Sequence, residues 1–243
     1  MKVTIHTILI LLAIINIPSI LSGANQINSS IIIETINNEQ DVNYENVSII
    51  GVLNFTDLDN TELIENNMYQ SNIQVSIRFD NCIFTDTIIG YFNDDDNLSY
   101  NAVFYEDVIF TNCIFEEEFL FKYSKFENNA DFTYNHFKNR ILFKYTTFTY
   151  PISFISNIFE LEADFKYTNF EGSVNFSDVK FYDIAKFKYI KSKVDGDNPY
   201  TVEFEAEMVY NRMVLYQADV LHSHNVDLGM FTNNNRINQV FFM

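Results

Sequence analysis

The sequence predicts an all-β fold, a four-sided parallel β-solenoid, from two periodicities and one residue pattern. Phenylalanine recurs over positions 104–187 at steps that alternate between six and five residues. The tetrapeptides FKYS, FKYT, FKYT and FKYI begin at positions 121, 143, 165 and 187, which gives a 22-residue period. Small or aliphatic side chains stand two positions before most of these phenylalanines, and side chains two apart in a strand face the same side. Each half-repeat therefore reads as a very short strand, and the full period as one coil.

The phenylalanine series also excludes a long helix. A step of five residues turns a helical side chain by about 140°, so the two columns would not share one stripe. The segments after alternate phenylalanines are mostly polar and include Pro151 and Gly172, which is typical of turns. The series uses 16 of the 25 phenylalanines: Phe104, Phe110, Phe115, Phe121, Phe126, Phe132, Phe137, Phe143, Phe148, Phe154, Phe159, Phe165, Phe170, Phe176, Phe181 and Phe187.

The repeat resembles a known family. The stretches FENNADF (126–132), ADFTYNHF (130–137) and ADFKYTNF (163–170) look like the pentapeptide-repeat family, and the likeness covers roughly residues 76–190. The resemblance implies a right-handed quadrilateral β-helix, but no single activity, since the family's functions differ widely. This chain departs from the family by using phenylalanine almost throughout and by alternating five and six residues. The departure favours a 22-residue coil over a regular 20-residue one.

The first 24 residues have the pattern of a signal peptide. Lys2 precedes the apolar run at positions 3–17, Pro18 interrupts it, and Ser22 and Ala24 supply small residues for cleavage. We expect cleavage after Ala24 and a secreted or cell-surface protein, with no membrane span left after cleavage. The alternative is a protein anchored in the membrane by an uncleaved signal, because the apolar run is nearly long enough to span.

Three further regions follow the signal. Residues 25–75 are expected to form an irregular N-terminal β segment or cap, with β-like runs at 30–36 and 47–55. Residues 76–194 form the predicted solenoid, with residues 90–98 extruded from a corner as a loop. Residues 195–243 are expected to form an amphipathic helix, from about Pro199 to His222, and a tail. This helix is predicted to cap the last coil, and the alternative is that it or the bare stack pairs two molecules, so the protein is a monomer or a homodimer through the solenoid end.

Two outward columns are the candidate binding residues. Side chains that share one phase of the 22-residue period should stack along one edge of the solenoid. Like charges stacked at that spacing repel, so something must compensate them. Neighbouring acidic residues and an anionic surface polymer are the two candidates. The columns are Lys122, Lys144, Lys166 and Lys188, and beside them Tyr123, Tyr145, Tyr167 and Tyr189.

The two cysteines are expected to be stacked neighbours. Cys82 and Cys113 each stand in an NCIF motif, and their separation along the chain is one coil plus the nine-residue loop. Adjacent strands lie about 4.8 Å apart, which is within the Cα range of a disulfide. A disulfide in an exported protein and a pair of small inward thiols remain equally open. Two thiols alone do not complete a zinc site.

The remaining composition argues against catalysis and nucleic-acid binding. The formal net charge of −18 would repel a bare phosphate backbone. No nucleophile motif or convergent carboxylate pair is evident, and the acidic run Asp94–Asn97 lacks the spacing of an EF-hand. We therefore expect no catalytic residue, metal or cofactor.

Three function classes follow from these observations. The leading one is an exported, non-catalytic structural or interaction protein that uses the solenoid as a binding surface for an unknown protein or surface polymer. The alternative is an extracellular β-helix enzyme acting on polysaccharide, as β-helical lyases and hydrolases do. A DNA-mimicking inhibitor, as some pentapeptide-repeat proteins are, is less favoured, because an exported protein would not meet the intracellular target.

Overall fold

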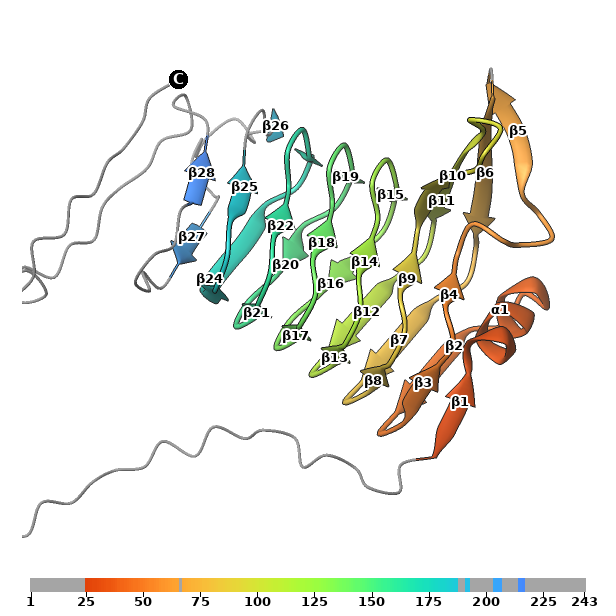
Figure 1. Ribbon diagram of the computed structural model, residues 1–243, viewed down its shortest axis with the longest axis horizontal. Helices are drawn as coiled ribbons and strands as arrows, with labels where there is room; N and C mark the ends of the chain where they lie inside the picture. Colours follow the sequence, from red (N-terminus) through yellow and green to blue (C-terminus); the bar gives the residue numbers. More distant parts are fainter. Residues whose placement is uncertain (1–24, 66, 188–190, 193–202, 207–213, 217–243) are drawn as a thin grey trace, which may run out of the picture.

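A computed structural model describes residues 25–65, 67–187, 191–192, 203–206 and 214–216. Over these residues the chain consists mostly of short strands, with one helix, α1 (Ser29–Asn37). The strands pair in a regular parallel series that stacks in sequence order along one axis (Figure 1). This arrangement confirms the predicted all-β parallel solenoid. The expected signal peptide, residues 1–24, lies outside the described residues.

The strands form three sheets. The 13-stranded sheet contains β1 (Gln26–Asn28), β2 (Val42–Glu45), β3 (Ser48–Ile50), β7 (Ile77–Asp80), β8 (Ile83–Phe84), β12 (Val108–Thr111), β13 (Ile114–Phe115), β16 (Ala130–Asp131), β17 (His136–Phe137), β20 (Ile152–Ser153), β21 (Ile158–Phe159), β24 (Val174–Phe181) and β27 (Glu203–Ala206). The eight-stranded sheet contains β5 (Glu62–Glu65), β6 (Met68–Ile73), β10 (Tyr91–Asn93), β11 (Ser99–Phe104), β15 (Lys125–Phe126), β19 (Thr147–Phe148), β23 (Asn169–Phe170) and β26 (Lys191–Ser192). The seven-stranded sheet contains β4 (Leu53–Asn54), β9 (Ile88–Ile89), β14 (Phe119–Leu120), β18 (Ile141–Leu142), β22 (Ala163–Asp164), β25 (Ala185–Phe187) and β28 (Val214–Tyr216).

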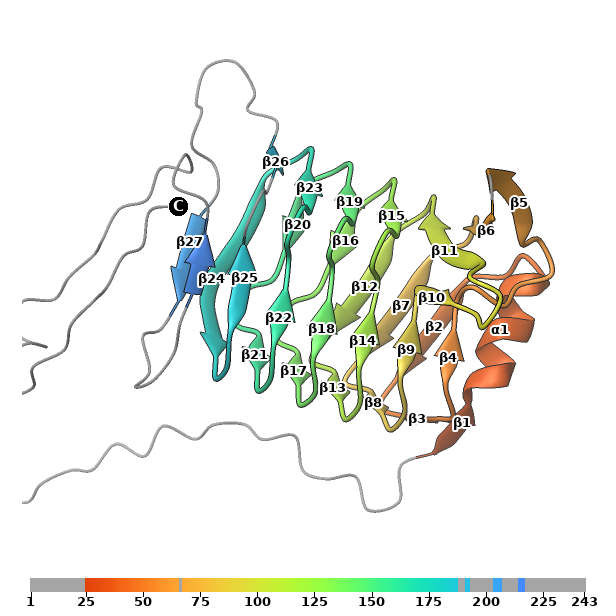
Figure 2. The same cartoon turned by 45° about the horizontal axis from the view of Figure 1, so that its top comes forward.

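Each coil places one strand on each of four faces. From β12 the chain passes through β13, β14 and β15 and then returns to β16, which pairs in parallel with β12. Figure 2 shows β14, β18 and β22 side by side on one face, and β15, β19 and β23 on the adjoining one. The 13-stranded sheet covers two faces because β24 pairs with both β20 and β21.

The interior is a stack of phenylalanine rings. In the regular part, phenylalanines one coil apart in the sequence occupy paired positions on neighbouring strands, for example Phe115 and Phe137. Their rings stack nearly parallel, with centroids 4.6 Å apart. Rings from adjoining faces meet edge to face, as Phe132 and Phe143 do at 5.6 Å. Both geometries are favourable for aromatic pairs, so the spacing of phenylalanine in the sequence is the spacing of the core.

Two insertions interrupt the coils at the same corner. Residues that face each other in the first and second coils are 35 positions apart in the sequence, as the contact of Ser76 with Asp41 shows. Those in the second and third coils are 31 positions apart, as the contact of Thr111 with Asp80 shows. The excesses over 22, which are 13 and nine residues, fall between β4 and β6 and between β9 and β11. The pairing of Ile83 with Ile114 confirms that residues 90–98 are an insertion that leaves the register intact.

The two insertions build a projecting sheet, which we call the blade: β5, β6, β11 and β10. β6 pairs with β11 along six residues, and β5 and β10 each add an antiparallel strand. The residues expected to form an extruded loop are therefore part of a hairpin. The rings of Tyr69 and Tyr100 stack at 5.0 Å, and those of Phe92 and Tyr100 at 4.6 Å, which stabilises the blade beyond the solenoid wall (Figure 1).

The N-terminal end of the stack is closed by a helix. The run at 30–36, expected to be β-like, is the middle of α1, and that expectation is wrong. The side chain of Asn28 caps the helix by accepting a hydrogen bond from the Ser30 N–H, and Ile32 and Ile36 are buried one turn apart. A helix can cover the open end of the first coil because its i and i+4 side chains point to the same side.

The prediction of an amphipathic helix over residues 199–222 is wrong for the two segments of this range that the structure describes, because both are strands. β27 (Glu203–Ala206) pairs with β24, and β28 (Val214–Tyr216) pairs with β25, both in parallel. The backbone register places Phe204 opposite Phe176 and Tyr216 opposite Phe187. The unpaired backbone of the last coil is a template for further strands, and this outweighs the helical spacing of the apolar residues. The rest of 195–243 lies outside the described residues.

Candidate functional site

The candidate binding columns lie on a tight corner between the seven-stranded and eight-stranded sheets. The N–H of Thr146 donates to the carbonyl oxygen of Phe143 at 3.0 Å, and the N–H of Ser124 donates to that of Phe121 at 3.1 Å. The third residue of each turn is a tyrosine with positive φ, as in a type II turn. The three values are 58° at Tyr123, 62° at Tyr145 and 60° at Tyr167.

The turn itself does not require tyrosine. The left-handed region is unfavourable for bulky residues, and asparagine and aspartate occupy it far more readily. The matching position of the opposite tight corner holds four different residues, Asn112, Tyr134, Ser156 and Asp178, all with positive φ. Tyrosine recurs in three successive coils of the candidate corner despite this conformational cost. The side chain, rather than the turn, is therefore what these positions supply.

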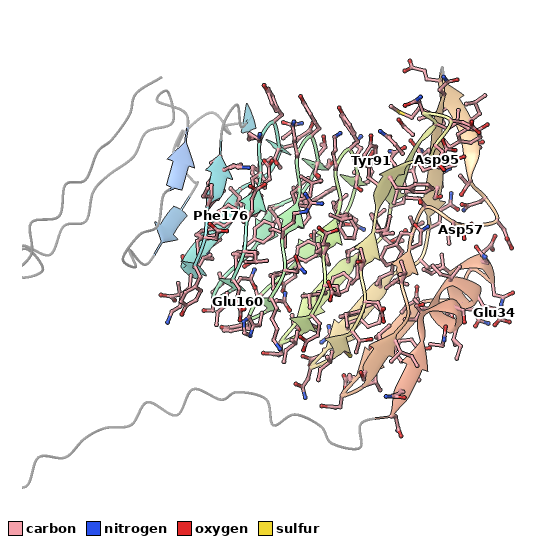
Figure 3. All side chains as sticks on the ribbon, viewed as in Figure 1. Glu34, Asp57, Tyr91, Asp95, Glu160 and Phe176 are labelled. Carbon is pink, nitrogen blue, oxygen red and sulfur yellow. The ribbon has the colours of Figure 1, made fainter. Side chains whose placement is uncertain are left out.

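The tyrosine rings form a continuous exposed stack. Tyr123 and Tyr145 stack at 4.8 Å and Tyr145 and Tyr167 at 4.6 Å, with interplanar angles of 6° and 11°. Tyr91 of the blade closes the row, edge to face with Tyr123 at 5.2 Å (Figure 3 labels Tyr91). Tyr123, Tyr145 and Tyr167 remain 38%, 36% and 38% exposed. Because neighbouring rings cover each other's faces, the row presents ring edges and hydroxyl groups to solvent.

The lysines lie beside this stack. Lys122 Nζ is 4.9 Å from the ring centre of Tyr91 and 4.7 Å from that of Tyr123. Lys144 Nζ is 5.1 Å from the ring centre of Tyr145 and 5.8 Å from that of Tyr167. These are cation–π distances. We call the set the tyrosine–lysine ladder; its members are Tyr91, Lys122, Tyr123, Lys144, Tyr145, Lys166 and Tyr167.

The ladder differs from the neighbouring corners in its charge balance. Lys138 pairs with Glu116 at 2.8 Å and Arg140 with Glu118 at 2.7 Å, so stacked charges there alternate in sign. Within the ladder, Lys166 lies 3.6 Å from Asp164. Among the residues that the structure describes, Lys122 and Lys144 form no ion pair. Of the two compensations considered from the sequence, a neighbouring acidic residue is present for Lys166. The ammonium groups of Lys122 and Lys144 lie over tyrosine rings instead.

The phenol of Tyr123 is neutral and can donate a hydrogen bond. Burial raises the pKa of Tyr123 above its ordinary value, and the neighbouring Tyr145 and Tyr91 phenols raise it further. The hydroxyl therefore stays protonated at neutral and mildly alkaline pH. Together with the ammonium groups, the ladder presents a row of donors repeated at the height of one coil.

Charge is segregated along the solenoid axis. Residues 25–121 contain 18 Asp and Glu and a single cation, Arg78, a net charge of −17. Residues 122–192 contain eight Asp and Glu and ten Lys and Arg, a net charge of +2. Because the coils stack in sequence order, the acidic half is the end that carries α1 and the blade, where Glu34, Asp57 and Asp95 lie (Figure 3). Every member of the ladder except Tyr91 lies in the cationic half, which explains how a protein of net charge −18 can present a strip of donors.

Cys82 and Cys113 occupy an inward corner position where later coils of the solenoid have an asparagine that donates a hydrogen bond to the backbone. Asn135 Nδ2 donates to the Phe110 carbonyl at 2.7 Å, and one coil earlier Cys113 Sγ lies 3.6 Å from the Phe79 carbonyl. Both cysteines are buried free thiols, and they directly precede the paired strands β8 and β13. A hydrogen bond with Cys113 lowers the pKa of Cys82, and burial raises the pKa of Cys113 well above its ordinary value. The expected proximity is confirmed, and the disulfide stays a prediction.

Within the described part of the chain, no group of three or more His, Cys, Asp or Glu side chains is placed to hold a metal ion. The described residues also contain no helix that is long and apolar enough to cross a membrane. Of the eight residues in the two outward columns expected from the sequence, Lys188 and Tyr189 lie outside the described residues. The 22-residue period predicted the other six positions, but Tyr91 stands in the insertion, where no period could indicate it.

The fold and the ladder define a class: a parallel β-solenoid with an exposed row of tyrosine and lysine side chains on one corner. Comparison with known proteins gives no relative within that class, because no family model, no curated protein and no solved structure matches the chain.

Proposed function

We propose that this is an exported, non-catalytic interaction protein that binds an anionic surface polymer along the tyrosine–lysine ladder. In this proposal the fold is a right-handed quadrilateral β-helix of the pentapeptide-repeat kind, with a coil of about 22 residues. The solenoid acts as a rigid support that holds the donors in line. The observation that carries the proposal is the pair Lys122 and Lys144, whose ammonium groups lie over stacked tyrosines and lack acidic partners among the described residues.

The geometry favours a polymer with a repeated anionic group over a ligand that stacks on aromatic faces. Sugars and bases that bind tyrosine by stacking need an open ring face, and the interior rings of the ladder have their faces covered. Ammonium and phenol groups donate hydrogen bonds, so the complementary ligand supplies acceptors. A polysaccharide of uronic acids has carboxylates and hydroxyls at regular intervals and meets this requirement.

Reversing both unpaired ladder charges tests the proposal. We expect Lys122→Glu/Lys144→Glu to bind immobilised polygalacturonate about tenfold more weakly than the wild type, because two attractive contacts become repulsive. Binding of the wild type should weaken as ionic strength rises. Surface plasmon resonance at two salt concentrations measures both effects.

The matched control is Lys138→Glu/Lys186→Glu, which makes the same change in net charge at lysines that are ion-paired with Glu116 and Glu162. Its affinity should stay within about threefold of the wild type. Equal losses in the two double variants would mean that only net charge matters, and retention of binding by the ladder variant would refute the proposed site.

A further inference from the structure

The strand β5 (Glu62–Glu65) is the terminal strand of the blade. It pairs with β6 on one side and ends the eight-stranded sheet on the other. It stands at the outer edge of the blade, beyond the wall of the solenoid (Figure 1). Alternate residues of a terminal strand direct their N–H and C=O groups away from the sheet, where they are free to pair with another chain.

The side chains of β5 give this edge a definite character. All four residues are exposed, with Leu63 at 59% and Ile64 at 43%. Glu62 and Glu65 flank these two apolar residues. A second copy of the same strand on this edge would bring the glutamates of the two strands close together, and like charges on neighbouring strands are destabilising. The sequence of β5 therefore disfavours pairing with itself at neutral pH.

The surroundings reinforce the same charge. The acidic half of the solenoid, residues 25–121, has a net charge of −17, and its only cation, Arg78, is on β7 rather than on the blade. Edge strands are usually protected by lysine, proline or a covering element. β5 is short and its register with β6 is irregular between Leu63 and Glu65. Its charged residues are both glutamates, which repel an acidic strand and attract a basic one.

We propose that β5 binds an extended basic segment of a partner protein, which adds to the blade as a further strand. The partner segment has apolar residues at its centre and lysine or arginine on both sides. Backbone hydrogen bonds to β5 supply affinity, contacts with Leu63 and Ile64 bury apolar surface, and Glu62 and Glu65 select basic neighbours. This site is independent of the tyrosine–lysine ladder, so the protein can link a basic partner to an anionic polymer.

The test uses the intact protein and a short, blocked synthetic peptide of alternating lysine and valine, with fluorescence anisotropy as the readout. Two changes should each weaken binding by about tenfold or more. One is N-methylation of alternate peptide nitrogens, which removes the backbone donors that strand addition needs. The other is Glu62→Lys/Glu65→Lys, which reverses the flanking charges without touching a buried residue.

The matched control is Asp95→Lys/Asp96→Lys, the same charge change at two exposed residues of the other hairpin of the blade. It should retain affinity within about threefold. Three results would each overturn the proposal: no binding of the parent peptide, equal binding of the N-methylated peptide, or an equal loss in the control. A wild-type dimer that the peptide dissociates would assign β5 to a second copy and would overturn it as well.

Discussion

Phe143→Ala should lower the free energy of unfolding by about 3 to 5 kcal/mol, the largest effect that we expect from a single substitution. The ring of Phe143 is fully buried and stacks on Phe165 at 5.5 Å. It also meets the rings of Phe132 and Phe154 edge to face, both at 5.6 Å. Removing it loses the transfer energy of the ring and leaves a cavity that rigid neighbouring coils cannot close. Urea denaturation followed by circular dichroism measures the loss.

The neighbouring residue provides the control. Lys144 points outward at the next position, and Lys144→Ala removes only a partly exposed cation–π contact. We expect that variant to lose no more than about 1 kcal/mol. Comparable losses in the two variants would contradict the assignment of phenylalanine to the interior.

Asn157→Leu should cost about 2 to 5 kcal/mol, because it leaves two buried backbone groups without partners. Asn157 is fully buried; its Oδ1 accepts from the Asn135 N–H at 2.7 Å, and its Nδ2 donates to the Phe132 carbonyl. Leucine has a similar size but neither donor nor acceptor. Thermal unfolding and urea unfolding of this variant should give the same decrease in the free energy of unfolding.

Asn169→Leu is the matched substitution at a partly exposed asparagine, whose Nδ2 contacts Glu171 near solvent. Water can replace that contact, so we expect a loss below about 1 kcal/mol. If Asn157→Leu were as mild as Asn169→Leu, the corner hydrogen bonds would not be what holds successive coils together.

The periodic part of the fold could be predicted from the sequence because one residue type repeats at the spacing of the coil. The phenylalanine series led to inward columns, to the register across residues 90–98 and to the stacking of Cys82 on Cys113, and the structure has all three. Each of these depends on local geometry that every coil repeats. A repeated sequence reports such geometry directly.

The ends of the stack could not be predicted in this way. α1 has no repeat, and its helical state depends on the cap at Asn28 and on burial against the first coil. The insertion before β6 falls in the first coil, where Phe55 is the only phenylalanine before it and no repeated spacing defines the register. The apolar residues around β27 and β28 are spaced as in a helix. Both segments are nevertheless strands, because they pair with the open edges of β24 and β25.

The ladder was predicted in part. The 22-residue period placed lysine and tyrosine in adjacent columns, and the rings of Tyr123 and Tyr145 do stack one coil apart. The period could not show that the ammonium groups lie over the rings, because that depends on side-chain conformation. Nor could it show that Tyr91 ends the row, since this contact arises from the pairing of β10 with β11.

Lysine footprinting by reductive methylation, read by mass spectrometry with and without polygalacturonate, tests whether the tyrosine–lysine ladder is the binding surface. We expect the polymer to slow modification of Lys122 and Lys144, because their ammonium groups contact it in the proposed complex. Lys138, on the neighbouring corner and paired with Glu116, should react at the same rate in both samples. Protection of all lysines alike, or of Lys138 instead of the ladder lysines, would contradict the assignment of the ladder as the binding surface.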